Sequence, residues 1–391
     1  MTLKALVVFG TRPEAIKMAP LVAALRDSQE ICTKVAVTAQ HREMLDQVLE
    51  LFKIVPDYDL NIMRHGQTLA DITGRVVSGM QGIIEKEQPD VVLVHGDTTT
   101  TFAAALAAFY CKVPVGHVEA GLRTRNKYSP FPEEMNRRLT GSLADFHFAP
   151  TATARDNLLG EGISPESIFI TGNTVIDALL STVREDYRFT GPFAELDFAA
   201  QKLILVTAHR RENWGQPMEN VFYALRDIAD AFKDTIIVFP VHKNPVLQEL
   251  ARGILGGHQR IHLVQPMDYE PFGNLMAHSY LVLTDSGGLQ EEAPALGKPV
   301  LVLRQVTERP EAVAAGTVKL VGTDRRKIVE ETALLLSDRE AYDRMAQAVN
   351  PYGDGQASGR IAGWLLNRFG FFDTKPIEFS SQSIEKVSFS N

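Results

Sequence analysis

Acidic side chains occur in this sequence at points where they could act as general acids and bases. Asp97 comes directly after the apolar run VVLVHG, and Glu119 comes directly after VPVGHV. If these runs are neighbouring parallel strands, both carboxylates lie at one edge of a sheet, where close carboxylates push each other's pKa values apart. One group can then serve as an acid and the other as a base. For Asp97 the alternative is an ordinary helix N-cap, whereas Glu119 precedes Ala120-Gly121 and has no obvious helix to cap.

A second acidic pair opens a predicted helix. Glu133 and Glu134 follow Pro132 in SPFPEEMNRRL. Their ordinary role would be a favourable interaction with the helix dipole, because carboxylates stabilise the first turn of a helix. The other interpretation makes Glu133 a third acid–base candidate.

Cationic side chains follow strand-like runs further along the chain. His209, Arg210 and Arg211 come directly after an apolar run in TAHRRENWG. Their grouping at a strand end favours anion binding over an exposed basic turn. His209 could also donate a proton to a phosphate leaving group, since an unperturbed histidine titrates near pH 6.5. His242 and Lys243 in PVHKNP give a weaker signal of the same kind, which a surface turn would also explain.

The first predicted strand runs into FGTRPEAIKMAP. Gly10 allows a tight strand-to-helix turn, and Pro13 suits the start of a helix. Arg12 at that helix start opposes the helix dipole unless an anionic ligand joins it. Arg12 and the nearby Lys17 are therefore candidate ligand contacts, with solvated surface residues as the alternative.

The stretch TDSGGLQEEAP combines two features that appear to conflict. Ser286-Gly287-Gly288 follows an apolar run, so its backbone N–H groups could hold an anion at the start of a helix. Glu291 and Glu292 lie in the first turn of the same helix, where they would repel a phosphate. A ligand with both ribose and diphosphate reconciles them, because a carboxylate accepts hydrogen bonds from a ribose diol. We therefore expect a nucleotide ligand, with Glu292 at the ribose and Glu291 facing solvent.

Composition and the absence of other motifs exclude several classes of function. The chain has 391 residues, 45% of them hydrophobic, and a net charge of −8, which disfavours nucleic-acid and anionic-membrane partners. No GxxxxGK[ST] or GxGxxG fingerprint occurs, so neither ATP hydrolysis nor nicotinamide chemistry is expected. Two cysteines outside any cluster, and no DxD-like pair in a predicted loop after a strand, predict no metal site and no cofactor. No signal peptide or apolar span is recognisable, so we expect a cytoplasmic protein.

Strand-like runs alternate with helical patterns over most of the chain. Continuous apolar runs separated by helices are typical of parallel sheets covered on both faces. The predicted strands are 4–9, 34–38, 90–94, 113–118, 146–148 and 168–170, and then 203–206, 236–239, 261–264, 281–283, 300–303 and 319–321. This pattern predicts an α/β protein with two doubly wound Rossmann-like domains facing a central cleft.

The predicted domain boundaries lie in polar, irregular stretches. Residues 1–172 form the N-terminal domain with the carboxylates, and residues 173–355 form the C-terminal domain that binds the nucleotide. Residues 356–372 are expected to be a last amphipathic helix returning to the first domain. The Ser-rich residues 373–391 are expected to be a flexible tail.

These motifs together resemble the non-hydrolysing UDP-N-acetylglucosamine 2-epimerases. The resemblance is carried, in order, by GTRPEAIKMAP, HGDTTTT, HVEAGLRT, PFPEEMNR, TAHRREN, TDSGGLQEEAP and TERPE, and extends from about residue 3 to about residue 370. It implies a GT-B fold, a homodimer without metal or nicotinamide, and interconversion of UDP-N-acetylglucosamine and UDP-N-acetylmannosamine. The implied mechanism removes the C2 proton and expels UDP, and then re-adds UDP while a proton reaches the opposite face of C2.

The resemblance also implies roles for individual residues. The catalytic candidates are Asp97, Glu119, Glu133 and His209, and the order in which the carboxylates act stays open. The nucleotide-sugar contacts are Arg12, Lys17, Arg137, Phe272, Ser286, Gly287, Gly288, Glu292 and Arg309. A second, activating substrate molecule would bind at Gln40, His41, Gln67, Arg210 and His242, with Gly66 where relatives can carry a basic residue.

Other functions remain open from the sequence. A GT-B glycosyltransferase would share the UDP site but would use an acceptor groove and usually a single base. A hydrolysing epimerase would release UDP permanently, and a nucleotide-sugar sensor would need no acids. The downstream glycan, such as a cell-wall polysaccharide or a capsule, is not specified.

Overall fold

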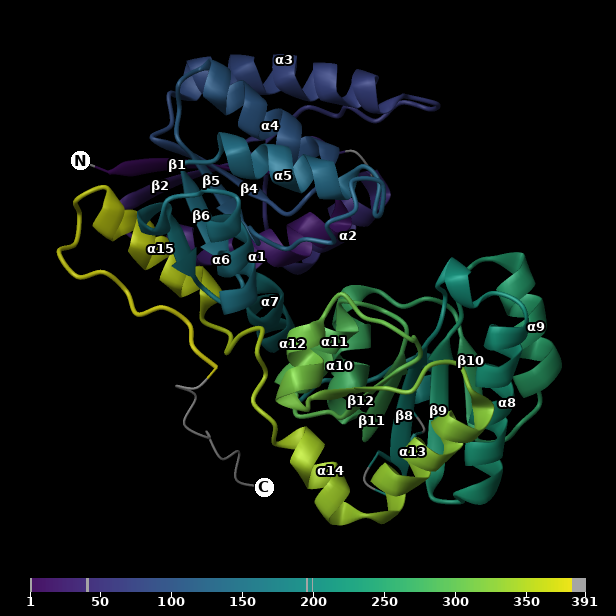
Figure 1. Ribbon diagram of the computed structural model, residues 1–391. Helices are drawn as coiled ribbons and strands as arrows, with labels where there is room; N and C mark the ends of the chain where they lie inside the picture. The colour runs from purple at the N-terminus through teal and green to yellow at the C-terminus, as the bar shows by residue number, and fades with distance from the viewer. Residues whose placement is uncertain (1, 40–41, 195, 199, 382–391) are drawn as a thin grey trace. The chain divides into compact units, whose positions relative to one another are not determined.

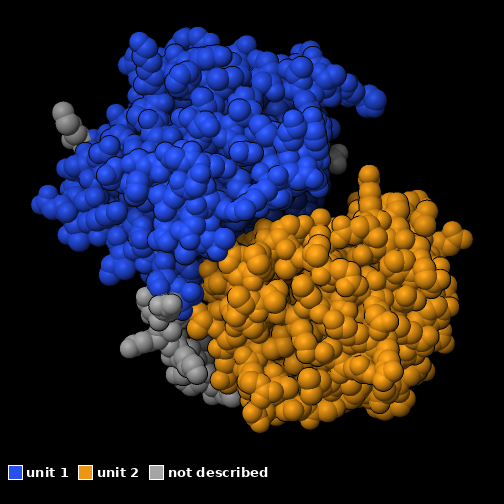
Figure 2. All heavy atoms as spheres, in the orientation of Figure 1, with its two compact units in different colours: residues 1–180, 352–391 blue, residues 181–351 orange. Residues whose placement is uncertain are grey.

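The structure is a computed structural model that describes residues 2–39, 42–194, 196–198 and 200–381. The chain forms two compact units, unit 1 from residues 1–180 and 352–391 and unit 2 from residues 181–351 (Figure 2). The sequence places the corresponding boundaries at 172/173 and 355/356.

Unit 1 is built on a parallel sheet of seven strands in the order β3-β2-β1-β4-β5-β6-β7. The strands are β1 (Leu3–Phe9), β2 (Ile31–Val37), β3 (Tyr58–Asp59), β4 (Val91–His95), β5 (Val115–Val118), β6 (Phe146–Ala149) and β7 (Ile168–Ile170). Helices cover both faces of this sheet, so the side chains on both sides of a central strand are buried. The central strands are therefore continuous apolar runs without alternating polar residues. The order reverses at β1, which pairs with β2 on one side and β4 on the other.

The helices of unit 1 lie in two layers. They are α1 (Arg12–Asp27), α2 (Arg42–Leu51), α3 (Leu69–Glu87), α4 (Thr99–Tyr110), α5 (Glu133–Leu143), α6 (Ala152–Gly160), α7 (Thr174–Thr182) and α15 (Ala357–Arg368). Helices α3, α4 and α5 pack side by side, and α1 packs against α2 and α15 (Figure 1). The apolar face of the first layer, with Val76, Met80 and Ala104, is fully buried.

Helix α15 belongs to unit 1 although it follows unit 2 in the sequence. Its Trp364 packs edge-on against Phe146 and Phe148 of β6, with ring centroids 5.0 and 5.3 Å apart. The chain then continues along β7, where the Phe379 N–H donates to the Ile170 carbonyl at 2.9 Å. The first part of the predicted tail is therefore packed on the sheet, and residues 382–391 lie outside the described residues.

Unit 2 repeats the architecture with six parallel strands in the order β10-β9-β8-β11-β12-β13. The strands are β8 (Lys202–Thr207), β9 (Thr235–Pro240), β10 (Ile261–Val264), β11 (Leu281–Thr284), β12 (Val300–Val302) and β13 (Val318–Leu320). The helices are α8 (Gln216–Ala231), α9 (Pro245–Leu255), α10 (Tyr269–His278), α11 (Leu289–Ala295), α12 (Pro310–Ala315), α13 (Arg325–Ser337) and α14 (Arg339–Ala346). Here the order reverses at β8, which lies between β9 and β11.

The predicted α/β fold with two doubly wound sheets is confirmed, and each predicted strand overlaps an observed one. The short edge strand β3 is the exception that the sequence does not predict. In an open parallel sheet, ligands bind beyond the carboxyl ends of the strands at the point where the order reverses. In unit 1 that point lies after β1 and β4, and in unit 2 it lies after β8 and β11.

Candidate active site

A buried glutamate fastens together the two loops at the reversal point of unit 1. Glu14, in the first turn of α1, accepts hydrogen bonds from the N–H groups of Gly10 (3.1 Å) and Thr11 (2.8 Å). Its other oxygen accepts from the hydroxyls of Thr98 (2.7 Å) and Thr101 (3.0 Å). Burial raises the pKa of Glu14, although these hydrogen bonds oppose the rise. The loop after β1 is thereby fixed to the loop after β4.

Gly10 is required where these loops meet. A Cβ at this position would lie 1.9 Å from the Thr38 hydroxyl oxygen and 2.7 Å from that of Thr100. These two buried hydroxyls are hydrogen-bonded to each other at 2.9 Å. The turn that begins α1 therefore has no space for a side chain.

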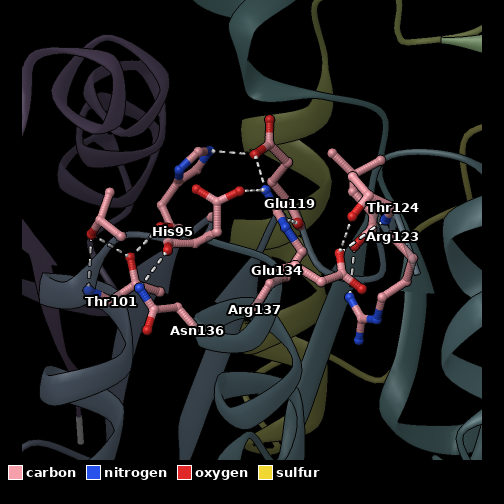
Figure 3. A network of polar contacts seen from close by, with 12 residues as sticks. His95, Thr101, Glu119, Arg123, Thr124, Glu134, Asn136 and Arg137 are labelled. Atoms are coloured by element: carbon pink, nitrogen blue, oxygen red, sulfur yellow. Dashed lines mark hydrogen bonds and ion pairs between the residues drawn. The ribbon is translucent and has the colours of Figure 1, made fainter. Parts of the chain in front are cut away.

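Glu119 lies at the end of β5 and projects into the centre of the cluster shown in Figure 3. Its backbone is in the left-handed region, with φ of 61°, which is uncommon for a residue other than glycine. The carboxylate is buried, forms an ion pair with Lys17, and accepts from Asn173 Nδ2 at 3.0 Å and Arg137 Nη2 at 3.2 Å. Strain of this kind is concentrated at functional sites.

The surroundings of Glu119 keep it ionised. Burial by itself would raise its pKa, but Lys17, His95 and Arg137 together hold the pKa well below the usual value for glutamate. A carboxylate with so low a pKa is a weak proton acceptor and a strong anchor for cations.

Arg137 of α5 joins the two carboxylates predicted to converge. Its Nη2 contacts Asp97 Oδ2 at 2.5 Å as well as Glu119, and its Nη1 donates to the Glu119 carbonyl oxygen. Burial would lower the pKa of Arg137, but Asp97 and Glu119 raise it, so the guanidinium stays charged. The neighbouring Asn136 donates from Nδ2 to the Asp97 carbonyl at 3.0 Å.

The N-cap alternative for Asp97 does not hold. Thr98 caps α4 by accepting from the Thr101 N–H at 3.1 Å, and the Asp97 carboxylate turns instead to Arg137. Asp97 is partly exposed, so a ligand can reach it.

His95, the last residue of β4, lies beside this pair. Its Nε2 is 4.0 Å from Glu119 Oε2, and neither ring nitrogen has a hydrogen-bond partner among the described residues. Burial lowers the pKa of His95 to about 4, although Glu119 opposes the shift. The imidazole is therefore neutral at neutral pH.

The two glutamates that open α5 have different surroundings. Glu134 is buried and accepts from the Thr124 N–H (2.9 Å), the Thr124 hydroxyl (3.1 Å) and the Arg125 N–H (3.2 Å), so it holds the preceding loop. The Glu133 Oε2 is buried and has no partner among the described residues. Glu133 precedes Asn136 and Arg137 by three and four positions, so these side chains share a face of α5.

Arg12 is the first residue of α1, where its positive charge opposes the helix dipole. It is partly exposed, and the structure gives it no ion pair among the described residues. A cation at a helix N-terminus without a counter-charge suits an anionic ligand.

The reversal point of unit 2 is organised by Asp285, directly after β11. The Asp285 Oδ2 accepts from the backbone N–H groups of His209 and Arg210, both at 2.8 Å. The Arg210 Nε also donates to the Asp285 carbonyl at 3.3 Å. His209 stacks on His242 with ring centroids 5.9 Å apart. The cationic residues predicted after β8 are thus fixed by the residue that begins the glycine turn.

The glycine turn has the features expected of an anion site. No described residue accepts a hydrogen bond from the N–H of Gly287 or Gly288. A Cβ on Gly288 would lie 3.4 Å from Glu292 Oε2 and 4.0 Å from the Ser286 hydroxyl, so the turn and the carboxylate are adjacent. Tyr269 of α10 donates to Glu292 Oε1 at 3.3 Å. Phe272, one turn further along α10, is partly buried.

The expectation that Glu291 faces solvent is wrong. Glu291 is only 2% exposed and forms an ion pair with Arg309, which was expected to contact the ligand. Its backbone carbonyl accepts from Asn350 Nδ2 at 2.9 Å. A buried carboxylate needs a charged partner, and Arg309 supplies it from the loop before α12.

The residues expected to bind an activating substrate are distributed over both units. In unit 1, Gln67 Oε1 accepts from Arg75 Nη1 at 3.2 Å. Arg210 and His242 belong to unit 2 and lie beside Asp285 and His209, as described above. Gln40 and His41 lie outside the described residues.

Three residues that hold the site together, Glu14, Asp285 and Asn173, were not predicted from the sequence. Glu14 could have been found, because Thr11 and Glu14 have the spacing of a capping box, which the structure contains. Asp285 had a signal as well, since it lies two positions after a predicted strand. Asn173, which contacts Glu119 from 54 positions away, had none.

Two classes of feature are absent from the described part of the chain. No group of three or more His, Cys, Asp or Glu side chains there could hold a metal ion. Nor does any helix within the described residues have the length and apolar character needed to cross a membrane.

Comparisons with known proteins give a consistent result. The family model described as UDP-N-acetylglucosamine 2-epimerase matches residues 23–366. UDP-N-acetylglucosamine 2-epimerase of Bacillus subtilis is 57% identical over 380 residues, covering 97% of this chain and 99% of the relative. The crystal structure of UDP-GlcNAc 2-epimerase from Neisseria meningitidis bound to UDP-GlcNAc has a TM-score of 0.81 and 51% identity, covering 93% of this chain and 100% of that chain. A structure of S. aureus MnaA with UDP has a TM-score of 0.87 and 51% identity, covering 97% and 100%.

Proposed function

Because the chain belongs to the UDP-N-acetylglucosamine 2-epimerase family, we propose that it interconverts UDP-N-acetylglucosamine and UDP-N-acetylmannosamine. In the forward direction a base takes the proton from C2 while the C1–O bond to UDP breaks, which leaves a C1=C2 double bond. UDP then adds back to C1, and an acid delivers a proton to the opposite face of C2. Every bond broken in the first half is restored in the second, so the reaction needs no oxidant or reductant.

The observation that carries this mechanism is the ion pair that holds Asp97 to Arg137, whose side chain shares a face of α5 with that of Glu133. Proton transfer on opposite faces of one carbon needs two groups held at fixed positions. Arg137 and Asn136 fix Asp97 through its carboxylate and its carbonyl.

We assign the proton transfers to Asp97 and Glu133 and the positioning of cations to Glu119. The pKa of Glu119 is held well below its usual range by Lys17, His95 and Arg137 against the effect of burial, so it is a poor base. Asp97 is partly exposed, and the Glu133 Oε2 lacks a partner among the described residues. Which of these two takes the first proton stays open.

In unit 2, we propose that the glycine turn and the cationic loop hold UDP. The N–H groups of Gly287 and Gly288 bind phosphate oxygens, and Glu292 accepts from the ribose diol. His209 and Arg210 neutralise the charge that develops on the diphosphate when it leaves C1. Arg12 and Lys17, which the resemblance assigns to the nucleotide sugar, supply positive charge in α1 of unit 1.

The test is the reaction of UDP-N-acetylglucosamine alone in heavy water. The expected products are a minor share of the manno epimer and deuterium at C2 of the sugar, without stoichiometric release of UDP. Unlabelled manno product would contradict the elimination, and complete conversion to free UDP would indicate a hydrolase. A sugar acceptor requirement would indicate a glycosyltransferase.

The variant Asp97→Asn separates catalysis from binding. Loss of a general acid or base typically costs at least about 10²-fold in turnover. UDP affinity, measured by calorimetry, should change little, because Asp97 is not among the residues assigned to UDP. A variant that lost UDP affinity and kept its turnover would show that Asp97 has only a structural role.

We further propose a homodimer in the cytoplasm that supplies cell-wall polysaccharide synthesis. We also propose that a second substrate molecule acts as an activator and is bound by Arg210 and His242 of unit 2. Light scattering of the purified protein tests the dimer. Activation predicts that UDP-N-acetylmannosamine alone reacts slowly and that a small amount of UDP-N-acetylglucosamine accelerates it. Equal progress curves with and without that addition would exclude activation.

A further inference from the structure

Asp285 divides its two carboxylate oxygens between different tasks. The side chain is fully buried, and its Oδ2 accepts from the N–H groups of His209 and Arg210 at 2.8 Å and from Asn213 Nδ2 at 3.4 Å. This oxygen builds the loop after β8. The Oδ1 is also buried and has no hydrogen-bond partner among the described residues.

An unpartnered oxygen on a buried carboxylate is costly, because the desolvation of the charge is not offset by a hydrogen bond. The imidazole of His209 lies beside this oxygen, with its Nε2 3.9 Å from Asp285 Oδ1. A hydrogen bond needs a separation of about 2.8 Å, so the ring has to approach by only about 1 Å.

The His209 ring has the freedom to make this movement. Its side chain is 43% exposed, and the ring stacks on that of His242. Among the described residues, the structure places His242 against the His209 ring and the Arg210 side chain against the Asp285 carbonyl. Arg210 has no acceptor, and the His242 Nδ1 already accepts from the Asn244 N–H at 3.1 Å, so neither competes with Asp285 as an acceptor.

We propose that Asp285 is a positioning residue for His209. When the diphosphate is bound, His209 Nε2–H donates to Asp285 Oδ1, and the nitrogen on the other side of the ring, Nδ1, donates to the phosphate oxygen that leaves C1. The imidazole is then held in one orientation with both N–H groups used, as in other sites where a buried carboxylate orients a catalytic histidine. This role of Asp285 rests on the proposed function, in which His209 stabilises departing UDP.

The variant Asp285→Asn keeps an acceptor for the loop N–H groups but removes the acceptor that faces His209. The amide oxygen can replace Oδ2 as the acceptor for the loop N–H groups, so the loop keeps its anchor. The amide NH₂ then takes the place of Oδ1 and presents a donor to His209, so the favoured hydrogen bond is reversed. Asp230→Asn is the matched control, because it removes an exposed carboxylate on α8 that pairs with another histidine, His258, at 3.1 Å.

The first measurement is the ¹⁵N spectrum of His209 in the protein saturated with UDP, assigned by its loss in His209→Gln. In the wild type, Nε2 should carry a hydrogen, and in Asp285→Asn the neutral ring should carry its hydrogen on Nδ1. A wild-type spectrum with a bare Nε2 would overturn the pairing, whatever the enzyme activity. This reading needs no turnover, so it is independent of the proposed epimerisation.

The second measurement is a double-mutant cycle on turnover. Asp285→Asn should lower kcat by 10-fold or more with little change in KM, on the order expected for a misoriented general acid–base group. In the His209→Gln background the same change should cost less than about 2-fold, because the residue it acts through is gone. Equal losses in both backgrounds would show a purely structural role. If Asp285→Asn fails to fold, the wild-type spectrum decides.

Discussion

The free energy of unfolding of unit 1 should fall when the pH is lowered into the weakly acidic range. Replacing His95 by asparagine should make this fall smaller. His95 is buried at the end of β4, and neither of its ring nitrogens has a hydrogen-bond partner among the described residues. The folded unit therefore resists protonation of this imidazole, whereas the unfolded chain accepts a proton freely. Asparagine has no proton to gain and removes this contribution.

The size of the effect follows from the two pKa values. Burial lowers the pKa of His95 to about 4 in the folded protein, against about 6.5 for a solvated histidine. Because the folded value is the lower one, the free energy of unfolding begins to fall below about pH 6.5 and continues to fall until about pH 4. Between about pH 7.5 and about pH 5 the loss from this one residue is roughly 2 kcal/mol.

Tryptophan fluorescence can follow unit 1 by itself. The chain has two tryptophans, Trp364 in α15 of unit 1 and Trp214 in unit 2. In a Trp214→Phe background, urea unfolding followed at Trp364 gives the stability of unit 1 with and without His95→Asn at both pH values.

The expected result is a smaller acid loss in the variant, by roughly 2 kcal/mol. Contributions from the other buried histidines, His117 and His147, whose pKa values burial also lowers, are present in both proteins and cancel. Parallel pH dependences in the two proteins would refute the reasoning, because they would mean that His95 has similar proton affinity in the folded and unfolded chains.

Three further substitutions test other parts of the structure. Gly10→Ala places a methyl group 1.9 Å from a buried threonine hydroxyl, and urea unfolding followed at the unit 1 tryptophan should show a loss of about 1–3 kcal/mol. Glu291→Gln removes the buried carboxylate that pairs with Arg309, which should lower the free energy of unfolding of unit 2 by about 3–5 kcal/mol. Thermal unfolding of unit 2 should then occur at a lower temperature. Tyr269→Phe removes the hydroxyl that donates to Glu292, and calorimetry should show UDP affinity reduced by up to about 10-fold.

The strands could be predicted from the sequence because the sheets are parallel and covered on both faces. A run such as VVLV in β4 is buried along its whole length and needs no alternation, so its composition alone identifies it. Strand β3 consists only of Tyr58 and Asp59, at the edge of the sheet beside β2. Two residues are too few to show a hydrophobic pattern that would predict a strand. Its position is fixed by pairing with β2 and not by its own composition.

Residues of the candidate site could be predicted where a polar side chain comes directly after a strand. They could not be predicted where their environment depends on side chains distant in the sequence. Asp97 and Glu119 were found because parallel strands end at one edge. The burial of Glu291 was missed because it depends on Arg309, which lies 18 positions away in a loop without periodicity. The contact of Asn173 with Glu119 likewise arises only once α7 is packed.

The return of the chain to unit 1 through α15 has a consequence during synthesis. Residues 181–351, which make up unit 2, are complete in the nascent chain before the ribosome has made Ala357–Arg368. Until then, the aromatic rings of β6 lack Trp364, which covers them in the finished protein. The half of the molecule that is translated first is thus the last to close its core, and in the interval it presents the apolar surface to which chaperones bind.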